Sequence, residues 1–442
     1  MLMNTIADKL NQAIEAANPH VYEMLSETGK NLFFPKGILS QSAEAKQKAH
    51  RINATIGIAK ENGSVMGLES ITSRINGMEP DEYLPYAPSF GKPELRDRWK
   101  KEIRRKNPSL SGKDISLPVV NCGVTHSIST FADVWIDPGD PVLLPDMMWG
   151  NYNMSLKVLK GADIQHYQAF TPDLSAFDLD SMEKAIQHFS SIHKKIVLIF
   201  NFPHNPSGYS LTEAEADRIA GILTRTAEKG VNIIAACDDA YFGLFYEKDT
   251  MKESLFSKLS GIHKRILSVK MDGATKEDFV WGFRIGFITY AITGKEALGP
   301  AHEALEKKTA GAIRGSVSNA SHLSQSLLLQ AIESDTYLKE KQEKFRLLKN
   351  RALKVKSVLQ LPRFQDAWEV YPFNSGYFMC IRLKKTDAEE LRVHLLEKYG
   401  TGLISVGSQN LRIAFSCLEE DEIEPLFDTI LKGIQDLSND GR

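Results

Sequence analysis

Short apolar runs alternate with longer amphipathic stretches through the middle of the chain. The apolar runs predict buried strands, and they lie at Pro141–Pro145, Asp163–Tyr167, Lys195–Asn201, Asn232–Asp238, Arg265–Lys270 and Ile285–Tyr290. Helical periodicity lies between several of them, as in Thr212–Glu228, whose start offers hydroxyl side chains suited to capping. This alternation of strands and helices predicts an α/β layer built on a mostly parallel sheet that helices flank.

The pattern changes after about residue 330. A long charged helical pattern, Thr336–Gln360, is followed by two short strand patterns, Gly376–Leu383 and Asn410–Phe415, and a final helix begins at Asp421. These elements predict a smaller α+β domain. The expected division is residues 1–75 as an N-terminal arm and part of the small domain, 76–330 as the large domain, and 331–442 as the small C-terminal domain. The pattern alone does not place residues 20–75.

Composition narrows the class of protein. The chain has 442 residues, of which 42% are hydrophobic and 25% charged, with a net charge of −2, so nothing favours nucleic acid as a partner. No apolar run approaches the roughly 18 residues of a membrane span, and the N-terminus lacks the apolar stretch of a signal peptide. Four scattered cysteines form no CxxC pair, so neither a metal site nor a disulfide framework is expected. We expect a cytoplasmic protein that does not bind membranes.

Two polar segments follow directly after predicted strands. One is the turn Asn201-Phe-Pro-His-Asn-Pro-Ser-Gly208, and the other is Asp238-Asp-Ala-Tyr241. Ligands of α/β proteins bind at the carboxyl ends of the strands, which makes Asn205, Asp238 and Tyr241 candidate site residues. Taken alone, each segment also fits a structural turn or a helix cap.

Two further segments place cations in unusual surroundings. Lys276 lies eight positions before Arg284, which glycines flank on both sides, and such a segment suits close approach to a phosphate. Arg412 interrupts an otherwise apolar strand pattern. A buried arginine requires an anionic partner, and this partner is either a protein carboxylate or the carboxylate of a ligand.

The order and spacing of these segments, from about residue 50 to 415, resemble the class I/II aminotransferases, which belong to fold type I of the pyridoxal phosphate (PLP) enzymes. The shared signatures are the Asn-Pro-x-Gly loop, the Asp-x-x-Tyr after the next strand, the lysine eight positions before a Gly-flanked arginine, and the late Asn-x-Arg strand. The resemblance implies a PLP-dependent aminotransferase. Such an enzyme moves the amino group of an L-amino acid to a 2-oxo acid by a ping-pong mechanism.

The resemblance also implies roles around the ring of the cofactor. Lys276 is the covalent anchor and the general base. Asp238 keeps the ring nitrogen protonated, so that the ring is a better electron sink. Asn205 and Tyr241 bond the phenolic oxygen of the ring, and Trp149 stacks on its face. The expected catalytic residues are therefore Lys276, Asp238 and Tyr241.

Other stretches match the parts of the family that bind phosphate and substrate. Val124 and Thr125, at a helix N-terminus, bind the phosphate with Arg284. Arg412 binds the α-carboxylate of the substrate, next to Asn205. Gly57 belongs to a loop, Asn53-Ala-Thr-Ile-Gly57, that closes over the substrate.

Two residues are expected to act across a homodimer interface. Tyr86 resembles the tyrosine that reaches the phosphate of the neighbouring subunit, although Tyr83 competes for this role. Arg314, in Arg314-Gly-Ser-Val-Ser-Asn319, resembles the arginine that binds a side-chain carboxylate in aspartate aminotransferases. If Arg314 has this role, the substrate is aspartate or glutamate. If it is a surface residue, an aromatic amino acid paired with 2-oxoglutarate fits as well.

The chain departs from the family pattern at two positions. Gly273 stands where many relatives carry a serine or threonine that binds the phosphate, so either the phosphate is bound more weakly or another group, such as Ser268, takes the place of this hydroxyl. Tyr152 stands where a histidine often supports the ring-binding aspartate.

Two alternative functions follow from the same fold. A PLP-dependent lyase shares the residues around the cofactor. A PLP-binding sensor of a transcription factor would need a DNA-binding module, and no basic recognition helix precedes the matching region.

Overall fold

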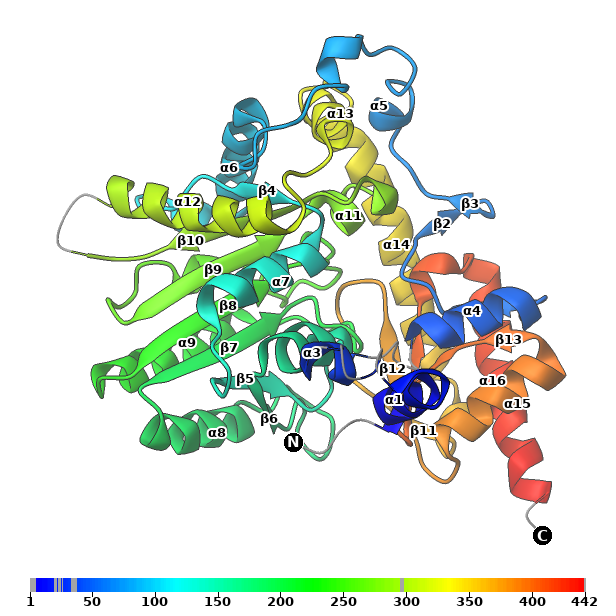
Figure 1. Cartoon of the computed structure of the whole chain (residues 1–442). Coiled ribbons are helices and arrows are strands. Elements are labelled where there is room, and N and C mark those ends of the chain that lie inside the picture. Colours follow the sequence, from blue (N-terminus) through cyan, green and yellow to red (C-terminus); the bar gives the residue numbers. More distant parts are fainter. Residues whose placement is uncertain are drawn as a thin grey trace.

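The computed structural model describes residues 5–19, 22, 25, 27–32, 38–294 and 298–440 (Figure 1). Its largest sheet has seven strands in the order β4-β10-β9-β8-β7-β5-β6. In that order they span Val119–Asn121, Gly286–Ala291, Ile266–Asp272, Asn232–Asp238, Lys195–Asn201, Pro141–Pro145 and Asp163–Tyr167. β10 is antiparallel to both of its neighbours, while the pairs from β9 to β6 are all parallel. The prediction of an α/β fold with a mostly parallel sheet is therefore confirmed.

The predicted strands agree closely with the observed ones. β5, β6, β7 and β8 have the predicted bounds, whereas β9 and β10 end one or two residues later than predicted. β7 and β8 are buried along almost their whole length because helices cover both faces of a parallel sheet. The three-residue strand β4 was not predicted, since so short a run has no measurable periodicity.

Helices pack along the large sheet. α7 (Val124–Trp135) lies against β9 and β10, and α12 (Gly299–Ser316) packs on α7 and β4. α8 (Leu179–Ile192) packs on β5, β6 and β7, while α9 (Glu213–Glu228) and α10 (Leu255–Leu259) pack on β8 and β9. α9 begins at the predicted place because Thr212 and Glu215 form a reciprocal capping box.

A second, antiparallel sheet lies in the C-terminal part of the chain. Its order is β11-β12-β15-β14, with bounds Trp368–Val370, Met379–Leu383, Asn410–Ile413 and Ile404–Val406. α15 (Ala388–Tyr399) and α16 (Glu420–Asp440) accompany it. β12 begins three residues later than predicted, after Gly376 with its positive φ of 70°, and β15 ends before a 3-10 turn, Phe415–Cys417.

Part of the segment before residue 75, which the sequence pattern did not place, packs on this C-terminal part. β1 (Ile52–Asn53) pairs in parallel with β13 (Thr401–Gly402), and α4 (Ile38–Lys48) lies beside β13, β14 and α15 (Figure 1). The remaining elements here are α1 (Thr5–Ala17), α3 (Glu27–Asn31), β2 (Lys60–Glu61), β3 (Ser64–Val65) and α5 (Glu69–Thr72).

One long helix, α14 (Tyr337–Leu359), contacts elements of both parts. It packs on α5 and α13 (His322–Ile332) and also on α16 (Figure 1). The other helical elements are α6 (Pro93–Lys106), α11 (Ala274–Glu277), the 3-10 turns Pro80–Glu82, Pro108–Leu110, Trp281–Phe283 and Pro362–Phe364, and a π-helical segment, Asn153–Val158. Within the described residues, no helix has both the length and the apolar character needed to cross a membrane.

Candidate active site

A cavity opens where the strands of the large sheet end. β7, β8 and β9 end at Asn201, Asp238 and Asp272, and the first turns of α7 and α11 follow β4 and β9. The cavity encloses about 480 Å³ of empty space, including its open mouth. Its lining is Val124, Thr125, Trp149, Asn201, Asn205, Asp238, Ala240, Tyr241, Thr275, Lys276 and Arg284.

Most of the site residues predicted from the sequence meet here. Those that line the cavity are Val124, Thr125, Trp149, Asn205, Asp238, Tyr241, Lys276 and Arg284. Arg412 and Gly57 border it: Arg412 bonds Asn205, and a Cβ on Gly57 would lie 3.4 Å from the Tyr241 hydroxyl. Tyr86 and Arg314 lie outside, on the surface of this chain, where Tyr86 is 91% exposed.

Asp238 is a buried carboxylate held by a phenol. The hydroxyl of Tyr152 donates to its Oδ2 at 2.5 Å, and the backbone N–H of Ala240 donates to Oδ1 at 3.2 Å. Burial raises the pKa of Asp238 to about 6, although the Tyr152 hydrogen bond and the nearby Lys276 favour the charged form. The neighbouring Asp239 points elsewhere and bonds Ser254. Asp238 is therefore the acid that faces the cavity.

Lys276 brings an amine into the cavity from the short helix α11. Its Nζ lies 5.0 Å from the centroid of the Tyr241 ring, and its backbone carbonyl accepts a hydrogen bond from Tyr377 at 2.9 Å. Burial lowers the pKa of Lys276 to about 8, Asp238 opposes this shift and Arg284 adds to it. A large part of the amine is therefore neutral at mildly alkaline pH.

The neighbouring Lys270 has a different environment. It is fully buried and forms ion pairs with Asp239 and Asp272, which outweigh the effect of burial and keep its pKa above the usual value. Lys270 does not line the cavity. The geometry thus distinguishes Lys276 from the nearest buried lysine.

The N-terminus of α7 and Arg284 form a site suited to an anion. Gly123, with a φ of 87°, precedes the helix, whose first residues are Val124 and Thr125. A Cβ on Gly123 would lie 2.9 Å from an Arg284 nitrogen, so only glycine leaves the guanidinium its place. Free backbone N–H groups, the helix dipole and a guanidinium together favour a phosphate.

Arg412 is buried, and no carboxylate within the described part of the chain forms an ion pair with it. Its Nη1 lies 3.1 Å from Oδ1 of Asn205, its Nη2 donates to the carbonyl of Thr55 at 2.9 Å, and its Nε has no partner among the described residues. Burial lowers the pKa of this guanidinium. Of the two partners that the sequence left open, the geometry favours the carboxylate of a ligand.

Three residues that line the cavity were not predicted: Asn201, Ala240 and Thr275. Asn201 links two loops, because its Oδ1 accepts the backbone N–H of Asn205 and its Nδ2 donates to the carbonyl of Asp238. Thr275 is buried, and its hydroxyl lacks a hydrogen-bond partner among the described residues. The only signal for Thr275 was a hydroxyl next to Lys276, and this is too common to single out a residue.

The structure also explains why Gly273 carries no side chain. A Cβ there would lie 2.5 Å from the carbonyl oxygen of Ile285, so a serine does not fit. The suggestion that Ser268 replaces the missing hydroxyl is wrong, because its hydroxyl donates to the carbonyl of Leu259 and does not line the cavity. Thr275, the residue before Lys276, also lines the cavity and carries a hydroxyl.

Comparisons with known proteins agree on one family. The family model for aminotransferase class I and II matches residues 68–430. The aspartate aminotransferase of Sulfurisphaera tokodaii is 25% identical over 351 residues, which cover 77% of this chain and 80% of that protein. The 1-aminocyclopropane-1-carboxylate synthase 11 of Arabidopsis thaliana is 25% identical over 372 residues, which cover 80% of this chain and 75% of that protein. Among solved structures, an aminotransferase from Anaerococcus prevotii has a TM-score of 0.80 at 24% identity, covering 92% of this chain and 98% of its own.

Proposed function

Because this chain belongs to the class I and II aminotransferases, we propose that it transfers the amino group of an L-amino acid to a 2-oxo acid in a ping-pong reaction. Membership of the family makes it a PLP-dependent transferase. When bound, PLP supplies an electron sink for the negative charge that develops on the α-carbon of the substrate. The residues of the chain then have to bind the two molecules, orient them and move the proton.

The cavity fits PLP at both of its ends. At one end, the N-terminus of α7, Thr125 and Arg284 suit the phosphate, and the lack of a side chain at Gly123 lets the Arg284 guanidinium lie beside this helix end. At the other end, Asp238 suits a protonated ring nitrogen. Asn205 and Tyr241 would bond the phenolic oxygen, and Trp149 would stack on the ring. We propose Thr275 as the hydroxyl that replaces the one missing at Gly273.

Lys276 would hold the cofactor covalently and then act as the base. With a pKa of about 8, the free amine is neutral often enough to accept a proton from the α-carbon near neutral pH. Asp238, whose pKa is raised to about 6, is still mostly charged at neutral pH. Within one buried site, Lys276 thus suits the role of a base and Asp238 the role of a charged partner for the ring nitrogen.

The observation that carries the proposal is the uncompensated charge of Arg412. A buried guanidinium with a free Nε and no acidic partner within the described residues is costly, unless a carboxylate occupies the site during function. All amino acids and 2-oxo acids share such a carboxylate. Gly57 lies beside Tyr241 and Phe378, where a Cβ would press on the Phe378 ring.

Which substrate side chain the site accepts depends on whether a second cation, Arg314, reaches it. Arg314 is exposed near the end of α12 and bonds the hydroxyl of Ser318 in the same chain. We propose that the protein is a homodimer, in which Arg314 and the exposed Tyr86 reach the site of the other subunit. Aspartate or glutamate then suits the site. An aromatic amino acid with 2-oxoglutarate remains the second choice, and relatives are named for both kinds of substrate.

The alternative is elimination by the same fold. The similarity to 1-aminocyclopropane-1-carboxylate synthase 11 shows that other reactions occur among the relatives. The deciding experiment mixes the PLP-loaded protein with a panel of L-amino acids, with and without 2-oxoglutarate, and quantifies glutamate, oxo acids and ammonia. Amino transfer predicts glutamate and a new oxo acid in equal amounts. Ammonia released without any acceptor would contradict it and support a lyase.

The Arg314→Ala variant tests the substrate class. If Arg314 binds a side-chain carboxylate, this change raises the KM for dicarboxylates far more than the KM for aromatic substrates. Equal effects on both would rule out the dicarboxylate assignment.

We also propose that residues 1–75, 76–330 and 331–442 are the three parts of the subunit, which the pairing of β1 with β13 supports. The cytoplasmic location expected from the sequence stays a prediction.

A further inference from the structure

Two buried carboxylates, Glu277 and Asp278, follow Lys276 directly, and the proposed function does not use them. Both belong to the turn that carries Lys276: α11 ends at Glu277, and the N–H of Asp278 donates to the carbonyl of Ala274. A helix of one turn has few hydrogen bonds of its own. The position of Lys276 therefore depends on what holds the end of this turn.

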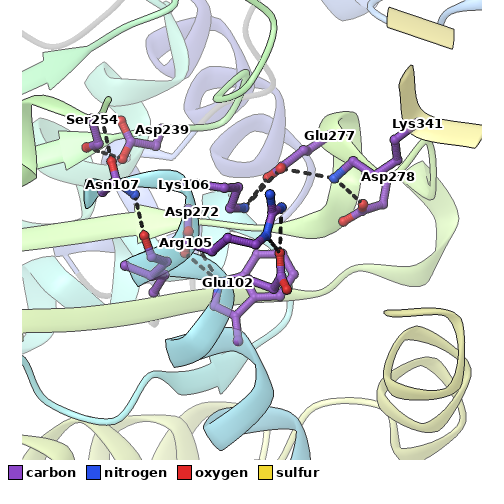
Figure 2. Close-up of polar contacts among 12 residues, drawn as sticks. Glu102, Arg105, Lys106, Asn107, Asp239, Ser254, Asp272, Glu277, Asp278 and Lys341 are labelled. Carbon is purple, nitrogen blue, oxygen red and sulfur yellow. Dashed lines mark hydrogen bonds and ion pairs between the residues drawn. The ribbon is translucent and has the colours of Figure 1, made fainter. Parts of the chain in front are cut away.

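Two lysines from distant helices hold these carboxylates (Figure 2). Lys106, the last residue of α6, lies 2.9 Å from both carboxylate oxygens of Glu277. Lys341, in α14, lies 3.0 Å from Glu277 and 2.7 Å from Asp278. The Tyr337 hydroxyl donates to Asp278 as well. Burial opposes the charge on Glu277, but the two ammonium groups outweigh it and bring its pKa to about 2.

Neither carboxylate lines the cofactor cavity. Glu277 lines a separate hollow together with Lys106 and Lys341, and this hollow shares no lining residue with the cavity that contains Lys276. While both outer carboxylates are paired, the charged groups that shift the pKa of Lys276 are Asp238 and Arg284. On the outer side, the two carboxylates thus face two ammonium groups of their own.

We propose that Lys106 and Lys341 are positioning residues for Lys276, which hold Glu277 and Asp278 on the outer side of the turn and neutralise them there. This inference rests on the proposed function of Lys276 as anchor and base. If either lysine were removed, the two buried carboxylates beside Lys276 would share a single ammonium group. The excess negative charge would stabilise a positive charge on the nitrogen of Lys276, and the turn would lose its link to α6 or α14.

α14 makes the link to Lys341 a rigid one. In the same helix, Glu340 accepts hydrogen bonds from Ser70, and Arg351 donates to the carbonyls of Lys60 and Ser416. Lys341 is therefore fixed by contacts with both the N-terminal segment and the C-terminal part of the chain. A matched lysine, Lys344, lies three residues further along and bonds only Glu61 among the described side chains.

The test follows the visible absorbance of the PLP-loaded enzyme as a function of pH. In Lys341→Met, we expect the midpoint of the absorbance change to rise by about one pH unit, because an added negative charge near Lys276 favours its protonated form. We expect kcat to fall at least tenfold with a smaller change in KM. The double variant Lys341→Met/Asp278→Asn should return the midpoint toward the wild-type value, and Lys341→Arg should keep it. Lys344→Met should leave it unchanged.

An unchanged midpoint in Lys341→Met, or a shift that Asp278→Asn does not reverse, would overturn the proposal. If Lys341→Met does not fold, Lys106→Met and the double variant Lys106→Met/Glu277→Gln decide by the same criteria. Failure of the proposed function looks different. In that case the wild-type protein itself would show no lysine-linked absorbance with PLP, whatever the variants do.

Discussion

The hydroxyl of Tyr152 lies 2.5 Å from Oδ2 of Asp238, so a buried phenol supports this carboxylate. Both groups are almost completely buried. Burial and the nearby Asp238 raise the pKa of Tyr152, so its hydroxyl keeps the proton and acts only as a donor. A histidine in this place could be charged, whereas a tyrosine cannot supply a positive charge. The negative charge of Asp238 is thus stabilised by a hydrogen bond without being neutralised.

The Tyr152→Phe variant tests this relationship. Loss of a hydrogen bond to the charged form raises the pKa of Asp238 further above its present value of about 6. We expect the acid limb of the kcat/KM profile to move up by about one pH unit, which corresponds to a hydrogen bond of about 1.5 kcal/mol. The control is Tyr209→Phe, which removes a hydrogen bond to Glu215 outside the cavity. An acid limb at the wild-type pH in Tyr152→Phe would show that the tyrosine does not tune Asp238.

Arg412→Lys tests the assignment of the substrate carboxylate. Lysine keeps the charge but cannot form the bidentate hydrogen bonds of the guanidinium. Their loss weakens binding of a carboxylate by about 2–3 kcal/mol. We therefore expect KM to rise roughly 100-fold for donors and acceptors alike, while the absorbance of the bound cofactor stays the same. Steady-state kinetics with one donor and one acceptor suffice. An unchanged KM for both would place the carboxylate elsewhere.

Lys276→Met should change stability in a pH-dependent way when no cofactor is bound. The pKa of Lys276 is lowered to about 8 in the folded protein, so the buried ammonium destabilises the fold fully below pH 8. This cost disappears as the pH rises from about 8 toward the unfolded value of about 10.4. We expect Lys276→Met to be more stable than wild type by about 2–3 kcal/mol at pH 7, with the difference vanishing near pH 10.5. Urea unfolding at several pH values measures it, and a difference independent of pH would contradict the shifted pKa.

Thr275→Val tests which hydroxyl replaces the one missing at Gly273. Valine keeps the shape and removes the hydroxyl, so we expect the dissociation constant of PLP to rise about tenfold or more, while Thr275→Ser retains affinity. Equilibrium dialysis gives this constant without reference to activity. Gly273→Ser should not improve binding, since its Cβ would press on the carbonyl of Ile285. Equal PLP affinity of Thr275→Val and wild type would exclude Thr275.

The strands and the residues at their ends could be predicted because both depend on local sequence. Apolar runs such as Lys195–Asn201 are buried on both faces, and the polar residue that ends each run marks the edge of the sheet. Asp238 could therefore be predicted as a site residue from its position at the end of a strand. The family resemblance then supplied the role that position alone could not give.

The rest depended on contacts between distant segments. The link between Lys341 and Asp278 joins residues far apart in the chain, and neither has a distinctive neighbourhood in the sequence. Pairing of the two-residue strand β1 with β13 is equally invisible to periodicity. Thr275 became a candidate only when the structure showed that its hydroxyl is buried without a partner among the described residues and that Gly273 has no room for a side chain.

The claim on which the account depends is that Lys276 holds the cofactor. Borohydride reduction of the PLP-loaded protein fixes the linkage, and mass spectrometry of the peptides then locates it. We expect the reduced cofactor on Lys276 alone, and none in Lys276→Ala. A reduced cofactor on another lysine of the wild-type protein, such as the buried Lys270, would contradict the account.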